Sequence, residues 1–141
     1  MRRQPFALVG AAVLLSAGVA SAQVSLKDVQ SRFTPDYAKC MASPAGMSTL
    51  GMVDCIGQET AVQDRRLNEA YRKALKDMTP DERKGLQAAQ RAWIVFRDAD
   101  CSARVDSLQW GAISRINGAL CRLDDTVART IELETFPPND R

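Results

Sequence analysis

The chain has 141 residues, a formal net charge of +2 and no histidine. This length suits a single domain with a modest hydrophobic core. The near-neutral charge argues against the one-sided basic surface that nucleic-acid binding requires, and the missing histidines exclude Cys/His zinc sites and histidine-dependent catalytic triads.

Residues 1–22 have the pattern of a cleavable export signal. Arg2 and Arg3 precede an apolar stretch, and the small residues Ala20-Ser21-Ala22 follow it. The apolar stretch is shorter than the roughly 20 residues that span a bilayer. We therefore expect one mature domain over residues 23–141, in a bacterial periplasm or secreted, with no stable membrane insertion. The 19 basic residues less Arg2 and Arg3 leave 17, which equals the 17 acidic residues.

The mature part begins with signals for two helices. Thr34-Pro35-Asp36 is a helix-start pattern that predicts a short helix to about Met41. Ser43-Pro44-Ala45-Gly46 should end that helix. A long helix is then expected over Leu50–Met78, where apolar residues recur at helical spacing. They are Val53, Ile56, Thr60, Leu67, Tyr71, Ala74 and Met78.

The segment Thr79-Pro80-Asp81-Glu82 combines a capping box with proline at the first helical position. The helix that follows it should bury one apolar stripe, formed by Leu86, Ala89, Trp93, Phe96 and Ala103. Because the connection at Thr79 is short, the two long helices are expected to form an antiparallel hairpin.

A third long helix is expected near the C-terminus. Residues 107–111 predict a loop, and the helix after it has Ile113, Ile116, Leu120, Leu123, Val127 and Ile131 on one face. Phe136-Pro137-Pro138 should end this helix. The predicted fold is therefore all-α: a small helical bundle built on a long antiparallel hairpin plus a C-terminal helix.

The four cysteines predict two disulfides that staple this bundle, because an even number of cysteines in an exported domain is typical of disulfide pairing. Pairing Cys40 with Cys55 and Cys101 with Cys121 closes short loops, each worth up to about 3 kcal/mol, and we favour it. Pairing Cys55 with Cys101 and Cys40 with Cys121 stays open, because these cysteines lie near one level of the hairpin.

Polar residues of the two hairpin helices should also face each other. With the turn near Thr79, Asn68 is level with Gln90, and Glu59 and Asp64 each lie within one turn of Arg97. Leaving a buried polar group unpaired costs about 1–3 kcal/mol, so we expect a structural polar network. The alternative is an acidic and amide-rich pocket acting on a glycan, which would need two carboxyl groups flanking a cleft.

The predicted loop after the second long helix is a candidate protein-binding tip. It contains Trp110, and an exposed loop aromatic between small polar residues suits a partner contact. We therefore name Ser107, Gln109, Trp110 and Ser114 as candidate partner-binding residues. The alternative is that Trp110 covers the end of the bundle. Residues 43–49 form a second candidate tip.

The hairpin and the C-terminal helix contain a spaced set of residues: Cys55, Glu59, Asp64-x-x-Leu67-Asn68-x-x-Tyr71, Leu86-x-x-x-Gln90-Arg91-Ala92-Trp93-Ile94-x-x-Arg97-Asp98-x-x-Cys101, Cys121 and Thr126-x-x-Arg129. This set resembles the LprI-type lysozyme-inhibitor-like domain, a family of small exported domains with four cysteines. The resemblance covers residues 40–133. The resemblance implies a helical, disulfide-bonded periplasmic domain and inhibition of lysozyme.

Two functions follow as hypotheses. The first is a periplasmic or secreted binding protein that inhibits lysozyme-type muramidases, with a lysozyme or another cell-wall hydrolase as its partner. The second is a structural or envelope-stress interaction module without inhibitory activity. An enzyme is not expected, because no nucleophile and base can be paired without histidine. We therefore predict no catalytic residue, no cofactor and no metal.

Overall fold

A computed structural model describes residues 23–76, 78–105 and 111–136 of the chain. These residues form the helices α1 (Leu26–Gln30), α2 (Pro35–Ala42), α3 (Thr49–Lys76), α4 (Pro80–Val105) and α5 (Ala112–Glu134), with a short 3-10 helix η1 (Pro44–Met47) before α3. No strand occurs in these ranges. The prediction of an all-α fold is confirmed, and α1 is an addition to the expected helices.

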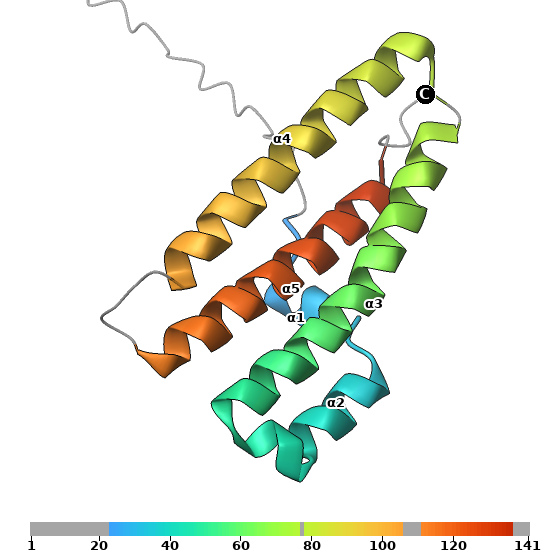
Figure 1. The fold of residues 1–141 in the computed structure, drawn as a ribbon. Helices are drawn as coiled ribbons and strands as arrows, with labels where there is room; N and C mark the ends of the chain where they lie inside the picture. The colour runs from blue at the N-terminus through green and yellow to red at the C-terminus, as the bar shows by residue number, and fades with distance from the viewer. Residues whose placement is uncertain (1–22, 77, 106–110, 137–141) are drawn as a thin grey trace, which may run out of the picture.

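The long helices α3 and α4 meet near Thr79 and diverge from there, and α5 lies between them (Figure 1). Helix α5 packs against α3 along much of its length and also against α4. The two hairpin helices therefore splay apart, and the C-terminal helix α5 packs between them. This arrangement is the predicted bundle of a hairpin plus a third helix.

The core consists of two clusters along this bundle. One cluster lies toward the Thr79 turn, where buried residues of α3, α4 and α5 meet: Leu67, Ala70, Ala74, Met78, Leu86 and Leu133. The other lies between α1, α3 and α5 and contains Val29, Ile56, Leu123 and Val127. Helix α5 contributes to both clusters, so its burial ties the two halves of the domain together.

The two disulfides are those that the sequence favoured. Cys40 and Cys55 join α2 to α3 with a Cα–Cα distance of 5.7 Å. Cys101 and Cys121 join α4 to α5 with a Cα–Cα distance of 5.5 Å. The alternative pairing is therefore excluded. The first disulfide fixes the short helix α2 to α3, and the second joins the two long helices α4 and α5.

The buried face of α4 differs from the predicted stripe. Phe96 is 64% exposed, and Ala89 and Ala103 are also exposed. The residues that turn inward are instead Leu86, Gln90, Trp93, Arg97 and Cys101, which are buried or half-buried. The reason is that Cys101 must face α5 to reach Cys121, and helical steps of three and four from Cys101 lead to Arg97 and not to Phe96.

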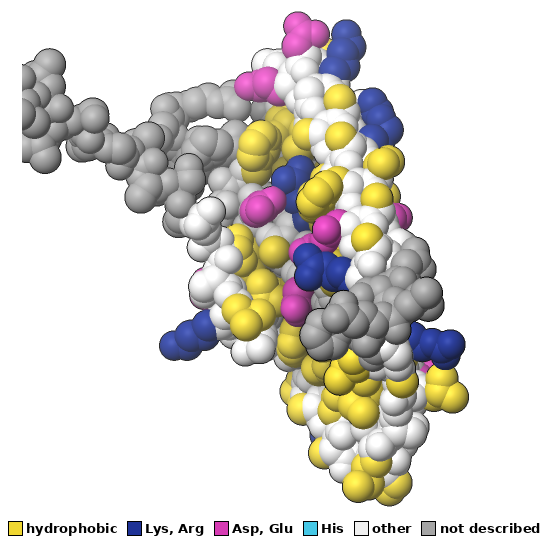
Figure 2. All heavy atoms as spheres, turned by 90° about the vertical axis from the view of Figure 1, so that its left-hand side faces the viewer, with side chains coloured by type: hydrophobic (Ala, Val, Ile, Leu, Met, Phe, Trp, Pro, Cys, Tyr) yellow, Lys and Arg dark blue, Asp and Glu magenta, His cyan; other side chains and the backbone are white. Residues whose placement is uncertain are grey.

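The outer face of α4 consequently carries apolar side chains. Val95 and Phe96 are both exposed there. Figure 2 views the molecule from the left-hand side of Figure 1 and shows hydrophobic side chains interspersed with charged ones over this side. Of the helices that the structure describes, none is both long enough and apolar enough to cross a membrane.

Candidate functional site

The motif residues of the two hairpin helices meet around a groove between α3 and α4. The groove has a volume of about 360 Å³. Helices α3 and α4 each present one face to it, because residues three and four apart share a side of a helix. The lining residues are Asp64, Leu67, Asn68 and Tyr71 from α3 and Gln87, Gln90, Arg91, Ile94 and Arg97 from α4.

The polar side chains on the α4 wall of the groove are anchored to α5. The Gln90 Oε1 atom accepts a hydrogen bond of 2.9 Å from Arg129 Nε. Arg97 Nη1 donates to Thr126 Oγ1 over 3.2 Å, and Arg97 Nη2 lies 2.9 Å from Asp98 Oδ1. The bonds to Arg129 and Thr126 join α4 to α5 and thereby fix the positions of the Gln90 amide and the Arg97 guanidinium.

The polar side chains on the α3 wall are held within their own helix. Asn68 Nδ2 donates to the Asp64 backbone carbonyl over 2.9 Å and to Asp64 Oδ2 over 3.2 Å. Within the described ranges, no hydrogen bond joins Asn68 or Asp64 to α4. Asn68 and Gln90 therefore both line the groove, but no hydrogen bond joins these two described side chains.

Glu59 lies apart from this groove, in a buried cluster below α2. Its side chain is 2% exposed and accepts hydrogen bonds from the Thr34 amide (3.0 Å), from Thr34 Oγ1 (2.5 Å) and from Gln63 Nε2 (2.6 Å). Gln63 Nε2 also donates to the Arg32 carbonyl over 2.8 Å. Glu59 thus holds the start of α2 against α3, and Arg97 is not among its partners.

Gln63 and Thr34 were not among the predicted network residues. Gln63 is 1% exposed, and it lies four residues from both Glu59 and Leu67. That position places Gln63 on the buried face of α3, which is the signal that identifies it. Thr34 was predicted only as a helix cap, and its hydroxyl does accept a hydrogen bond from the Tyr37 amide over 3.2 Å.

Residues 43–50 form a tip at the end of the molecule where α2, η1 and the start of α3 meet (Figure 1). Met47 is 83% exposed and Leu50 is 70% exposed. The segment from residue 41 to residue 53 contains no charged side chain. The Cys40–Cys55 disulfide closes the base of this tip. The tip is therefore an uncharged, covalently anchored projection with two apolar side chains in solvent.

Tight backbone packing holds the tip in place. A Cβ atom on Gly46 would lie 2.4 Å from the Met41 carbonyl oxygen, and one on Gly51 would lie 1.5 Å from the Ala45 carbonyl oxygen. Glycine is therefore needed at both positions so that the backbone segments can approach each other. The Gly51 amide also donates to Ser48 Oγ over 3.0 Å, which fastens the start of α3.

The other candidate tip falls largely outside the described part of the chain. Ser107, Gln109 and Trp110 lie outside the residues that the structure describes. Ser114 is described and is 5% exposed, and its hydroxyl donates to the Gly111 carbonyl over 2.7 Å. Ser114 therefore stabilises the first turn of α5, and its hydroxyl is not presented on the surface.

The sequence was compared with models of known protein families. The model of a family described as lysozyme inhibitor LprI matches residues 40–133. The chain belongs to this family. The matched region includes both disulfides, the groove and the tip. No curated protein and no solved structure matches the chain.

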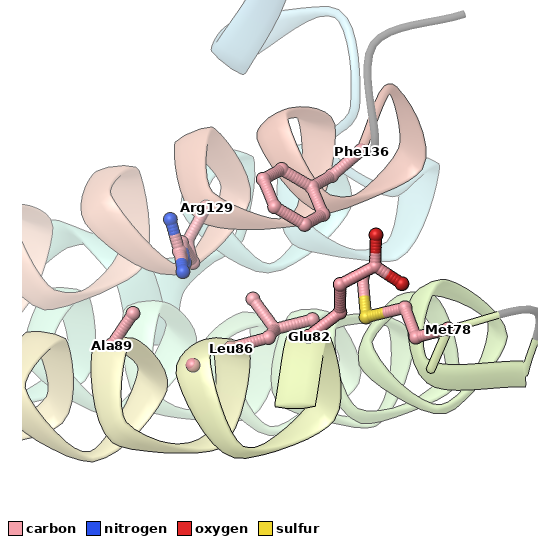
Figure 3. Close-up of a pocket in the computed structure, with 7 residues that line it drawn as sticks. Met78, Glu82, Leu86, Ala89, Arg129 and Phe136 are labelled. Atoms are coloured by element: carbon pink, nitrogen blue, oxygen red, sulfur yellow. The ribbon is translucent and has the colours of Figure 1, made fainter. Parts of the chain in front are cut away.

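The LprI domain also has an apolar pocket near the Thr79 turn, which its sequence did not reveal. The pocket has a volume of about 370 Å³ and is lined by Met78, Glu82, Gly85, Leu86, Ala89, Arg129 and Phe136. Figure 3 shows the Arg129 guanidinium on one side of the pocket, with Glu82, Met78 and Phe136 toward the other. Arg129 Nη1 is bonded to Glu132 Oε2 over 2.9 Å, so its charge is already balanced by α5 itself.

Carboxylates surround the second disulfide of the LprI domain. Asp125 Oδ2 lies 3.6 Å from Cys101 Sγ, and Asp100 Oδ2 lies 3.7 Å from Cys121 Sγ. All four side chains bring possible metal-ligand atoms within 4.8 Å of one another. The two sulfurs are bonded to each other, however, so neither is available as a thiolate ligand.

Asp125 and its neighbour Asp124 have raised pKa values. Burial raises the pKa of Asp125 above its ordinary value of 3.8, and the negative charge of Asp100 raises it further, whereas Arg104 and Arg97 oppose the shift. Burial also raises the pKa of Asp124, with a second contribution from Asp125. The ionised forms of these groups are therefore disfavoured in the folded LprI domain.

Proposed function

We propose that this protein is an exported binding protein that inhibits lysozyme-type muramidases. Membership of the LprI family supports an inhibitor-like binding function. The observation that carries the proposal is the tip at residues 43–50, which exposes Met47 and Leu50 on a disulfide-anchored base. An inhibitor acts by occupying a cleft, and a convex apolar tip has the shape and the chemistry for that role.

Rigidity of the tip favours tight binding. A segment that is already ordered loses little conformational entropy on association, so more of its contact energy appears as affinity. The Cys40–Cys55 disulfide and the close approach at Gly51 supply this order. Because residues 23–141 carry equal numbers of acidic and basic residues, long-range attraction is weak and the contact surface itself must provide the affinity.

The location and the mode of action follow from the same features. The N-terminal signal pattern and two disulfides support export to the periplasm or beyond, because disulfides persist in oxidising compartments. The sequence contains no histidine for acid–base or nucleophilic catalysis. We infer a binding role and not a catalytic one.

The test measures cell-wall clearing by lysozymes of the c, g and i types in the presence of the purified chain with both disulfides formed. We expect inhibition of at least one type, and a loss of about ten-fold or more in inhibition for the double variant Met47→Ser/Leu50→Ser, because buried apolar anchors dominate interface energies. The variant Val95→Ser/Phe96→Ser, which changes two exposed residues of α4, is the matched control and should inhibit normally.

The variant Trp110→Ala separates the two candidate tips. If Trp110→Ala inhibits fully and Met47→Ser/Leu50→Ser does not, the tip at residues 43–50 is the part that contacts lysozyme. The opposite pattern assigns the contact to the segment around Trp110, and the tip at residues 43–50 is then not the inhibitory element. Melting temperatures of all variants show whether each one is folded.

A second function is favoured by the outer face of α4. Val95 and Phe96 are exposed on a helix that already packs on α5 through its other side, so this face suits docking to a further protein. This is the structural or envelope-stress interaction module without inhibitory activity. Failure of every lysozyme to bind or to be inhibited would favour this function over inhibition.

A further inference from the structure

We propose that the groove between α3 and α4 is a binding site for a neutral saccharide that carries N-acetylated amino groups. This site is separate from the tip that is proposed to contact lysozyme. Asp64 lies thirteen positions after Gly51 on α3, which corresponds to about 20 Å along the helix axis. The saccharide site therefore does not depend on inhibitory activity, and the two can be tested independently.

The first argument concerns the burial and the hydrogen bonding of the Gln90 side chain. Its side chain is only 8% exposed, and its Oε1 atom is held by Arg129 Nε. An arginine only donates hydrogen bonds, so this contact fixes which side of the Gln90 amide faces α5. Gln90 Nε2 has no hydrogen-bond partner among the described residues. An amide nitrogen without a protein partner, on a residue that is otherwise almost fully buried, remains available to a ligand or a water molecule.

The unpaired nitrogen is not sealed from solvent. No side-chain nitrogen or oxygen in the described ranges is both fully buried and without a partner. Gln90 Nε2 must therefore reach solvent, and the groove is a cavity that Gln90 lines. The groove thus presents a fixed hydrogen-bond donor from its α4 wall.

The α3 wall of the groove contributes a hydrogen-bond acceptor. Asn68 uses its Nδ2 atom to bond Asp64, which leaves Oδ1 free of protein partners in the described structure. A secondary amide of a ligand needs one acceptor for its N–H group and one donor for its carbonyl. Asn68 Oδ1 and Gln90 Nε2 supply this pair from opposite walls. An acetamido group matches both, and its methyl group suits the apolar side chain of Ile94, which also lines the groove.

Other residues that line the groove can bind hydroxyl groups next to the acetamido group of the ligand. Tyr71, Gln87 and Arg91 line the groove, and their side-chain polar groups make no hydrogen bond or ion pair with other described residues. Together they offer donors and acceptors that sugar hydroxyl groups can satisfy. Leu67 adds an apolar wall against which the C–H face of a sugar ring can pack. The volume of about 360 Å³ lies at the small end of the range for ligand pockets, ~300–1,000 Å³.

The charges in the groove favour a neutral ligand. Asp64 and Arg91 contribute one charge of each sign. The Arg97 guanidinium is met by Asp98 Oδ1 at 2.9 Å and stacks 4.9 Å from the centroid of the Trp93 ring. Asp98 Oδ1 also lies 3.7 Å from Arg122 Nε, so two arginines share this carboxylate. The groove thus has charges of both signs in its lining, and its three amide side chains offer neutral recognition.

The test is a titration of the full exported chain, with both disulfides formed, followed by two-dimensional nuclear magnetic resonance of the side-chain amide groups. The probe is a trimer of β-1,4-linked N-acetylglucosamine. We expect its addition to shift the side-chain amide signals of Gln90 and Asn68. Maltotriose, which lacks acetamido groups, and N-acetyl-triglycine amide, which lacks sugar hydroxyls, should bind at least ten-fold more weakly.

Variants on the exposed wall keep the test independent of folding. Asn68 and Gln87 are exposed, so Asn68→Ala and Gln87→Ala should leave the melting temperature nearly unchanged. Each should weaken binding of the trimer by about five-fold, the value of one hydrogen bond. Gln58→Ala, at an exposed amide of α3 outside the groove, is the matched control and should bind normally.

Three results would overturn the proposal. The first is the absence of any shift at Gln90 and Asn68 at millimolar concentrations of the trimer. The second is equal binding of the trimer by the Asn68→Ala variant and by the unchanged protein. The third is binding of maltotriose or N-acetyl-triglycine amide as tight as that of the trimer, which would remove the selection for an N-acetylated sugar. None of these results bears on inhibition through Met47 and Leu50.

Discussion

Arg129 of α5 donates its Nε hydrogen to Gln90 Oε1 of α4 over 2.9 Å. The Arg129 guanidinium also lies 5.9 Å from the centroid of the Trp93 ring, whose other guanidinium neighbour is Arg97 at 4.9 Å. The hydrogen bond between Arg129 and Gln90 therefore couples the C-terminal helix to the α4 wall of the groove. It orients the Gln90 amide and contributes to the stability of the bundle.

This coupling predicts a stability loss in the variant Gln90→Ala. Removal of the amide takes away a partner of the half-buried Arg129 guanidinium, so the free energy of unfolding should fall by about 1–3 kcal/mol. Urea unfolding followed by circular dichroism measures this change. Gln87→Ala, at an exposed glutamine of the same helix, should change the free energy by less than about 0.5 kcal/mol. Equal stability of the two variants would contradict a structural role for the contact.

Glu59 provides a second prediction, because its carboxylate is buried and accepts three hydrogen bonds. The variant Glu59→Ala leaves Thr34 and Gln63 without this acceptor, so we expect a loss of about 3 kcal/mol or more. Faster hydrogen exchange of the Thr34 amide should accompany the loss. Glu69→Ala removes an exposed carboxylate that pairs with Lys73, and its cost should stay below about 1 kcal/mol. Unchanged exchange at Thr34 would show that Glu59 does not hold α2.

Two glycines of α3 should respond in opposite directions to the same substitution. A Cβ atom on Gly51 would meet the Ala45 carbonyl oxygen at 1.5 Å, whereas one on Gly57 would meet nothing within 4 Å. Gly51→Ala should therefore lower the melting temperature and displace the tip. Gly57→Ala should raise the free energy of unfolding by about 0.5–1 kcal/mol, because alanine is the better helix former. Thermal unfolding of both variants checks the sign of each change.

Asp125 predicts a pH dependence of stability. Its pKa is raised in the folded state, chiefly by burial and then by Asp100. The folded protein therefore binds a proton more readily than the unfolded chain between pH 3.8 and the raised pKa, so this group's contribution to stability is lost as pH rises through that window. Asp124 acts with the same sign. Asp125→Asn should raise the melting temperature at pH 7 and have little effect near pH 4.

The matched control for this pH dependence is Asp54→Asn. Asp54 is exposed and bonds Gln58 on the surface of α3. Melting temperatures measured from pH 4 to pH 7 should show the same slope for Asp54→Asn as for the unchanged protein. A slope that is also unchanged in Asp125→Asn would show that Asp125 does not cause the acid-side stabilisation.

The helix boundaries illustrate how much local sequence determined. The Thr79 amide and hydroxyl both donate to Glu82 Oε2 over 2.8 Å, which is the predicted capping box at the start of α4. Thr34 caps the start of α2 in a simpler way, because its hydroxyl accepts a hydrogen bond from the Tyr37 amide. Caps, proline positions and the closure of short loops by Cys40–Cys55 and Cys101–Cys121 involve residues close in the chain. Such features depend little on what packs from elsewhere, so sequence alone predicts them.

Residues that line the groove could be predicted from the sequence, but the partners of their side chains could not. The hairpin register correctly placed Asn68 and Gln90 on facing sides. The sequence did not reveal that α5 would enter between α3 and α4 and take Gln90 and Arg97 as its own partners. Hydrophobic periodicity indicates which face of a helix is buried, but it does not identify the helix that buries it.

The sequence by itself thus determined the long helices, their caps and the family to which the chain belongs, and it favoured the disulfide pairing that the structure shows. Only the tertiary structure decided that Phe96 faces solvent, that the Glu59 carboxylate of α3 bonds Thr34 at the start of α2, and that polar residues of the hairpin surround an open groove. The physical reason is range: backbone capping and helix periodicity act over a few residues, whereas the position of α5 depends on contacts between segments far apart in the chain.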